Sequence, residues 1–82
     1  MSAVRQEPVE VWLAKGRPAR FVWRGRQFTV LAILERPPEA TDPAAQRCWR
    51  VTASHARDVP VGVFRLCLDP ADSRWLMSRE SD

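Results

Sequence analysis

The sequence has little of what most catalytic sites are made from. It contains a single histidine, His55, only three glycines and no tyrosine. Ser54 and Asp58 lie close to His55, but a Ser-His-Asp triad is built from residues that converge from separated positions, so these neighbours do not predict one. No glycine opens a predicted helix, which excludes a phosphate-binding glycine loop. We therefore expect no catalytic residue, no cofactor and no small-molecule substrate, and predict that the protein is not an enzyme.

Cysteine is also scarce, and long apolar runs are absent. Cys48 and Cys67 are too few and too far apart for a zinc site, and each falls within a predicted strand. We expect both to be buried free thiols and expect no bound metal. No apolar run approaches the roughly 20 residues of a membrane span, and the start MSAVRQEPVE lacks the apolar stretch of a signal peptide. We expect a cytoplasmic protein that makes no membrane contact.

The residues that are present indicate one small folded domain. Of the 82 residues, 45% are hydrophobic and 28% are charged, which is a globular composition. A chain of this length buries only roughly 60 to 65% of its unfolded surface, so the four tryptophans and three phenylalanines make up much of the core. We predict a single domain over residues 1–82, with residues 1–7 and 80–82 flexible.

Positive charge is concentrated in the first half of the chain. The net charge is +3, and Lys15 is the only lysine among the 13 basic residues. No acidic residue occurs between Val11 and Leu34, whereas the seven arginines from Arg36 onward are balanced by seven acids. The planar guanidinium group donates two hydrogen bonds to a phosphate at once. This distribution indicates an anionic partner, although a GC-rich genome also produces arginine-rich chains.

Short alternating segments, separated by glycine and proline, predict an all-β fold with little or no helix. Five or six short strands in a chain of this length are typical of a small antiparallel barrel or roll, as in SH3-like and OB-like modules. Apart from a central hairpin, the predicted strands are Pro8–Leu13, Gln46–Ala53, Val61–Leu68 and Arg74–Glu80. Val9, Val11 and Leu13 share one face of the first, and Trp49, Val51 and Ala53 share one face of the next. In the third, Phe64, Leu66 and Leu68 are predicted to point inward.

The stretch FVWRGRQFTV, residues 21–30, predicts the central hairpin. A two-residue loop at Arg24-Gly25 places Trp23 opposite Arg26, and the same register continues to an Ala19–Val30 pair. Arg-Gly is a weaker turn signal than Asn-Gly, so a loop longer by one residue is the alternative. Its inner face then carries Phe21, Trp23, Phe28 and Val30. The following Leu31–Leu34 run is apolar on both sides, which predicts a bending strand that is covered on both faces. Before the hairpin, residues 14–18 are predicted to form a turn.

A binding role fits this pattern better than catalysis. Small barrels bind single strands through a basic groove and aromatic rings on which bases stack. The candidate nucleic-acid-binding residues are Arg17, Arg20, Trp23, Arg24 and Arg26, with the arginines on phosphate and Trp23 stacking. An alternative is that the aromatics belong to the core and the arginines only solvate the hairpin. A second alternative is a protein-interaction adaptor that uses an edge strand or an exposed patch of Trp12 and Trp75.

The order of four segments resembles a family of short uncharacterised bacterial proteins, a domain of unknown function found mainly in actinobacteria. These segments are VWLAKGRPARFVWRGRQFTVLAILE, CWRVTA, VGVFRLCLD and SRWLMSRESD. The elements that carry the resemblance are Pro18, Phe21, Trp23, Gly25, Arg26 and Val30, then Trp49-Arg50-Val51 and Trp75-Leu76. The chain is similar, more distantly, to the C-terminal module of the catalytically inactive Y-family polymerase homologue of the bacterial translesion mutasome. That likeness implies a partner in a DNA-repair complex.

The chain departs from the family pattern at two places. Cys48 stands where relatives often have an aromatic residue, and Arg36-Pro37-Pro38 stands where some have a tryptophan. A stacking surface built from those aromatics is reduced in this chain.

Overall fold

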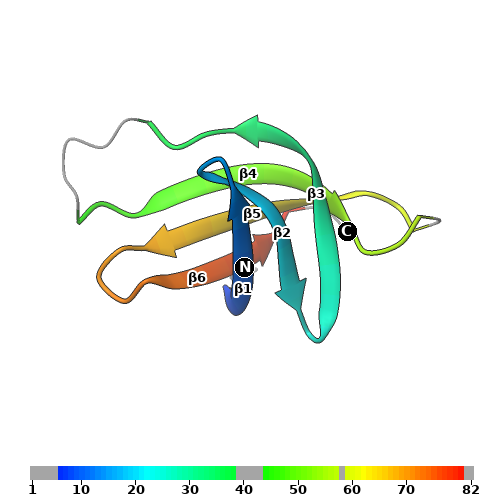
Figure 1. The fold of residues 1–82 in the computed structure, drawn as a ribbon, viewed down its shortest axis with the longest axis horizontal. Coiled ribbons are helices and arrows are strands. Elements are labelled where there is room, and N and C mark those ends of the chain that lie inside the picture. Colours follow the sequence, from blue (N-terminus) through cyan, green and yellow to red (C-terminus); the bar gives the residue numbers. More distant parts are fainter. Residues whose placement is uncertain (1–5, 39–43, 58, 81–82) are drawn as a thin grey trace, which may run out of the picture.

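The computed structural model describes residues 6–38, 44–57 and 59–80, and these form a six-stranded antiparallel barrel (Figure 1). Each strand pairs with the next along the chain, and β6 pairs with β1 to close the barrel. The predicted small all-β barrel is therefore confirmed. None of the described residues forms a helix with the length and hydropathy that a membrane crossing requires. The strands are β1 (Glu7–Ala14), β2 (Arg17–Trp23), β3 (Arg26–Glu35), β4 (Arg47–Ser54), β5 (Gly62–Asp69) and β6 (Arg74–Arg79).

Two hairpins have two-residue loops of the same type. Arg24 and Gly25 have φ values of 52° and 77°, and Trp23 pairs with Arg26 as predicted. Lys15 and Gly16 repeat this geometry between β1 and β2. Positive φ at both loop positions matches the twist of the flanking strands, and glycine adopts it without steric cost. The first turn is therefore shorter than predicted, and the residues that follow Gly16 already belong to β2.

The core is built from alternate positions of β2 to β6. In β4 the residues predicted to share a face, Trp49, Val51 and Ala53, are all buried, as are Phe64 and Leu66 of β5, which were predicted to point inward. The hairpin prediction also holds, because the Phe21 and Phe28 rings lie parallel with their centroids 5.0 Å apart. The buried hydrophobic cluster consists of Phe21, Phe28, Trp49, Val51, Ala53, Phe64, Leu66 and Met77.

Three leucines are exposed, and two of them were predicted to be covered. A bulge between Trp12 and Leu13 turns Leu13 out of the face of Val9 and Val11, and it is 52% exposed. Leu31 and Leu34 are 57% and 46% exposed, so the expectation that both faces of this run are covered was wrong.

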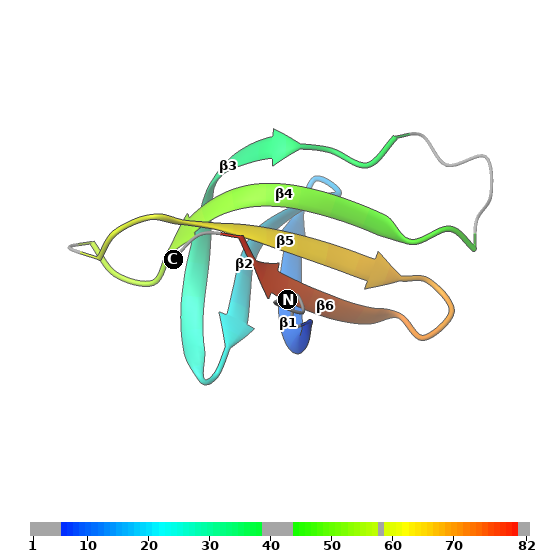
Figure 2. The same ribbon diagram turned by 180° about the vertical axis from the view of Figure 1, so that it is seen from behind.

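The reason for the exposure of Leu31 and Leu34 is the early end of the ladder between β2 and β3. Its last pair is Arg20 with Thr29, so the predicted Ala19–Val30 pair is missing from the ladder. From that point β3 continues beside β4, with irregular register at two places, and curves away from β2 (Figure 2). β2 therefore does not pair with β3 beyond Thr29.

The cysteines are not free thiols. Cys48 and Cys67 are directly opposite in the β4–β5 ladder, with Cα atoms 4.0 Å apart, and form a disulfide. Each cysteine was correctly placed in a strand, but the strand pattern does not fix the register that brings them together. The prediction of two buried thiols was therefore wrong.

Ion pairs hold both ends of the described chain. Glu7 in β1 accepts hydrogen bonds from Arg24, while Glu80 accepts them from Arg50 and Arg65. Partial burial raises the pKa of Glu80, but the two guanidinium groups together outweigh it, so its pKa lies below the ordinary value of 4.5. The predicted flexible ends are described only in part, because residues 1–5 and 81–82 lie outside the described residues.

Candidate functional site

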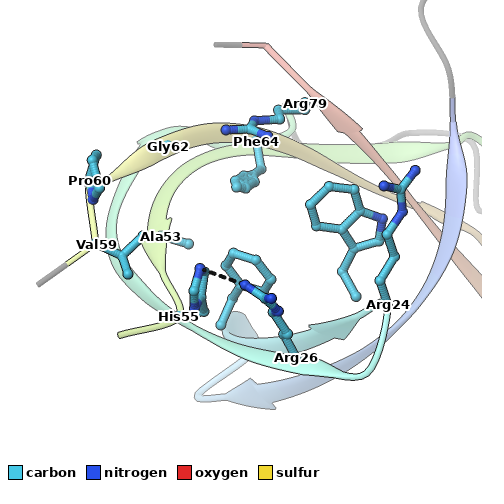
Figure 3. Close-up of a pocket in the computed structure, with 11 residues that line it drawn as sticks. Arg24, Arg26, Ala53, His55, Val59, Pro60, Gly62, Phe64 and Arg79 are labelled. Carbon is cyan, nitrogen blue, oxygen red and sulfur yellow. Dashed lines mark hydrogen bonds between the residues drawn. The ribbon is translucent and has the colours of Figure 1, made fainter. Parts of the chain in front are cut away.

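A pocket of about 390 Å³ lies where the tip of the β2–β3 hairpin approaches the loop between β4 and β5 (Figure 3). This volume falls in the lower part of the range for ligand sites, roughly 300 to 1,000 Å³. Four rings contribute to its lining, those of Trp23, Phe28, His55 and Phe64. The other lining residues are Arg24, Arg26, Ala53, Val59, Pro60, Gly62 and Arg79.

Gly62 sets the position of one of these rings. A Cβ atom at this buried glycine would lie 3.0 Å from the Phe64 ring, closer than side chains normally approach. The ring of Phe64 therefore occupies the space that a side chain at position 62 would need. Phe64 in turn packs against Phe28 at 5.4 Å and edge-on against Trp23 at 6.4 Å between ring centroids. The missing side chain thus allows the aromatic cluster to close around the pocket.

The polar part of the lining is positively charged. Figure 3 shows Arg26 beside His55 on one side of the pocket and Arg79 on the opposite side. Arg26 Nη1 lies 3.4 Å from His55 Nε2, and in this pair the guanidinium group can act only as the donor. The His55 ring also packs edge-on against Phe28. No carboxylate belongs to the lining among the described residues. The pocket therefore combines apolar rings with groups that bind anions.

Arg24 is held in place from two sides. Its guanidinium carbon lies 4.7 Å from the centre of the Trp23 ring, and its Nη2 donates to Glu7 Oε1 at 3.2 Å. Glu7 thus compensates part of the charge at this rim of the pocket. The buried Trp23 Nε1 has no hydrogen-bond partner among the described residues. Buried indole N–H groups rarely remain in that state.

The structure divides the five predicted site residues among three places. Trp23, Arg24 and Arg26 line the pocket together. Arg20 instead points to the outer face, where its guanidinium carbon lies 5.1 Å from the centre of the Trp12 ring. Arg17 lines a separate groove with Lys15 and Arg36. The arginines of the basic segment therefore do not form one continuous patch.

Sequence reasoning assigned eight of the eleven lining residues to no site, and these include His55, Gly62, Phe64 and Arg79. His55 directly follows β4, Gly62 begins β5 and Arg79 ends β6, so these three lie at strand ends. Their common feature is that antiparallel neighbours bring these ends to one edge of the barrel. Only the order of strands in the sheet could have signalled this proximity.

The predicted tryptophan patch corresponds to a different hollow. Trp12 is 40% exposed, and both Trp12 and Trp75 line a hollow between β1 and the turn from β5 to β6. Trp75 is half-buried and packs against Trp49, with ring centroids 5.4 Å apart. Trp12 is therefore the tryptophan with the accessible ring on this side.

Comparisons with known proteins identify a family. A family model described as Domain of unknown function (DUF6504) matches residues 1–82. This match agrees with the resemblance to an uncharacterised family. It does not bear on the actinobacterial distribution or on the similarity to the polymerase homologue, which stay predictions. Searches of the curated proteins and of the solved structures each gave no significant match.

Proposed function

We propose that this chain, which belongs to the family described as Domain of unknown function (DUF6504), binds single-stranded nucleic acid without catalysing a reaction. The observation that supports the proposal is the composition of the pocket. Four rings and three arginines line it, and no carboxylate does so among the described residues. An unpaired base with its phosphates has the matching chemistry, because it combines a flat apolar face with negative charge.

The geometry suggests that the rings contact the base and the arginines contact the phosphates. Phe28 and Phe64 are 5% and 2% exposed, so they support the pocket and offer little surface to a base. Trp23 and His55 are half-buried and present the accessible ring surface. A base that enters between them stacks at roughly 1 to 3 kcal/mol. Arg26 and Arg79, on opposite sides, then contact the phosphates before and after that base.

A titration of a fluorescein-labelled single-stranded oligothymidine tests this proposal at about 50 mM salt. The variant R24Q/R26Q removes two charges from the pocket, and R17Q/R20Q removes two charges elsewhere. We expect the pocket variant to weaken binding about ten-fold more than the matched control. Equal losses would show that net charge alone causes binding, and no binding by the wild-type chain would refute the proposal. The same titration with an oligouridine of equal length compares the affinity for RNA with that for DNA.

The similarity to the mutasome polymerase homologue supports a place for this binding in DNA repair, in the bacterial cytoplasm. The disulfide bears on that location, because disulfides are rare in reducing cytosol. Thiol labelling of the protein in freshly lysed native cells measures its redox state. Free thiols in the cell agree with a cytoplasmic location, and a fully oxidised protein contradicts it.

Protein interaction is the second candidate function, and the accessible Trp12 favours it. The hollow that Trp12 forms with Trp75 has an apolar wall and lies away from the pocket. Affinity capture from native lysate after nuclease treatment, with wild-type and W12A chains, distinguishes the two functions. Partners that vanish with nuclease indicate a nucleic-acid bridge, whereas partners lost only with W12A indicate a direct protein contact.

A further inference from the structure

The barrel has a seam that opens between β2 and β3. The ladder that joins these strands ends at Arg20↔Thr29. Beyond it, β2 pairs with β1 as far as Arg17, and β3 pairs with β4 as far as Glu35. The two strands therefore diverge, and one edge of β3 from Val30 onward has no ladder partner in β2. Figures 1 and 2 both show the β1–β2 turn and the end of β3 at the same side of the barrel.

A groove of about 370 Å³ occupies this seam. Pro18 and Ala19 line it from β2, and Leu31 and Ile33 line it from β3. Pro18 has no amide proton, so it cannot donate a hydrogen bond across the seam to β3. Leu31, which is 57% exposed, gives the groove an accessible apolar wall. The groove thus joins an apolar surface to a strand edge that has no ladder partner among the described residues.

Unpaired strand edges accept further strands, because their backbone N–H and C=O groups remain available for a ladder. Proteins that avoid such pairing protect these edges with charges, prolines or bulges. On β3 the register is irregular between Val30 and Ala32 and again between Ile33 and Glu35. These irregularities restrict an added strand to a short segment.

The charges around the groove define what segment fits. Lys15, Arg17 and Arg36 line it, and no carboxylate does so among the described residues. The nearest acid along β3 is Glu35, and its Oε1 lies 3.6 Å from Arg50 Nη1 in β4. A segment with acidic side chains complements the three cations, while apolar side chains at alternate positions contact Leu31 and Ile33.

We propose that the open edge of β3 at Leu31–Glu35 binds an extended acidic segment of a partner protein as an added β-strand. Backbone hydrogen bonds to the edge hold the segment, and Lys15, Arg17 and Arg36 select its acidic character. This surface is separate from the pocket of Arg26 and His55, because the two have no lining residue in common. The proposal therefore does not depend on nucleic-acid binding.

Fluorescence anisotropy with a labelled peptide of about eight residues, in which aspartate alternates with valine, tests the proposal. A second peptide of the same sequence carries N-methyl groups on alternate residues, which removes one row of backbone donors and keeps every charge. We expect N-methylation on the correct edge to weaken binding about ten-fold. Both N-methylation frames are tested, because only one row of donors faces β3.

The protein variants complete the test. We expect R17E/R36E to abolish binding of the acidic peptide and R24Q/R26Q to leave it unchanged. Equal binding of all N-methylated peptides would refute strand addition, and equal binding of a lysine-for-aspartate peptide would refute the charge selection. No binding up to about 1 mM would refute the proposal as a whole. If R17E/R36E instead abolishes oligonucleotide binding and leaves peptide binding intact, the groove belongs to a nucleic-acid surface and the proposal fails.

Discussion

Removal of the Cys48–Cys67 disulfide should destabilise the barrel by about 3 kcal/mol. The two cysteines are 19 residues apart, so the bond closes a loop of about 20 residues in the unfolded chain. The chain-entropy relation gives about 3 kcal/mol at 25 °C for a loop of that length. For a domain of this size, each 1 kcal/mol shifts the Tm by roughly 4 to 8 °C. The expected fall in Tm is therefore roughly 12 to 24 °C.

The assay is urea unfolding followed by tryptophan fluorescence, with and without a phosphine reductant. The wild-type chain should lose stability when it is reduced, while the C48A/C67A variant should be insensitive to the reductant. Mass spectrometry after alkylation counts the thiols in each sample. Two alkylated thiols in the native, unreduced protein, or a difference below about 0.5 kcal/mol between its oxidised and reduced forms, would refute the reasoning.

Three further predictions concern single side chains. G62A should push the Phe64 ring toward the pocket, and we expect about 1 to 3 kcal/mol lower stability in urea together with weaker oligonucleotide binding. E7Q should release Arg24 for phosphate and tighten oligonucleotide binding roughly two- to five-fold at low salt, whereas weaker binding would contradict competition between Glu7 and the ligand. E80Q should cost roughly 0.5 to 1 kcal/mol near pH 7. Because the pKa of Glu80 is lowered in the folded state, the wild-type advantage is present above the ordinary value of 4.5 and disappears as the pH falls through the lowered pKa, which urea midpoints of both chains measure.

The strand pattern predicted the fold well because its determinants are local. Alternation of apolar and polar residues grouped the buried residues of β4 on one face and identified the inner face of β5, and Gly25 marked the hairpin loop with the correct register. The features that were not predicted depend on how the strands pair with one another. Nothing local to β2 and β3 shows that their ladder ends at Thr29, and nothing near Cys48 shows that Cys67 lies opposite.

The candidate site also combines residues that are close in the sequence with residues that only the strand order brings together. Trp23, Arg24 and Arg26 line one pocket because they share one hairpin tip, whereas the sequence left open whether the arginines converge. Whether that tip binds nucleic acid stays a prediction. Arg20 faces outward because side chains alternate along a strand. Arginines that are close in the sequence therefore do not all lie on one surface. Arg79 reaches the pocket from the last strand of the barrel, and its place there depends on strand order alone.

The two short ladders on either side of the β1–β2 hairpin have a consequence for local unfolding. On one side the β1–β6 ladder extends only from Glu7↔Met77 to Val9↔Trp75, and on the other the β2–β3 ladder ends at Arg20↔Thr29. The sheet from β3 to β6, by contrast, is joined by long ladders and the disulfide. Amide hydrogens of the β1–β2 hairpin should therefore exchange with solvent through an opening of lower free energy than global unfolding. We therefore expect the β1–β2 hairpin to open separately from the four-stranded sheet of β3 to β6.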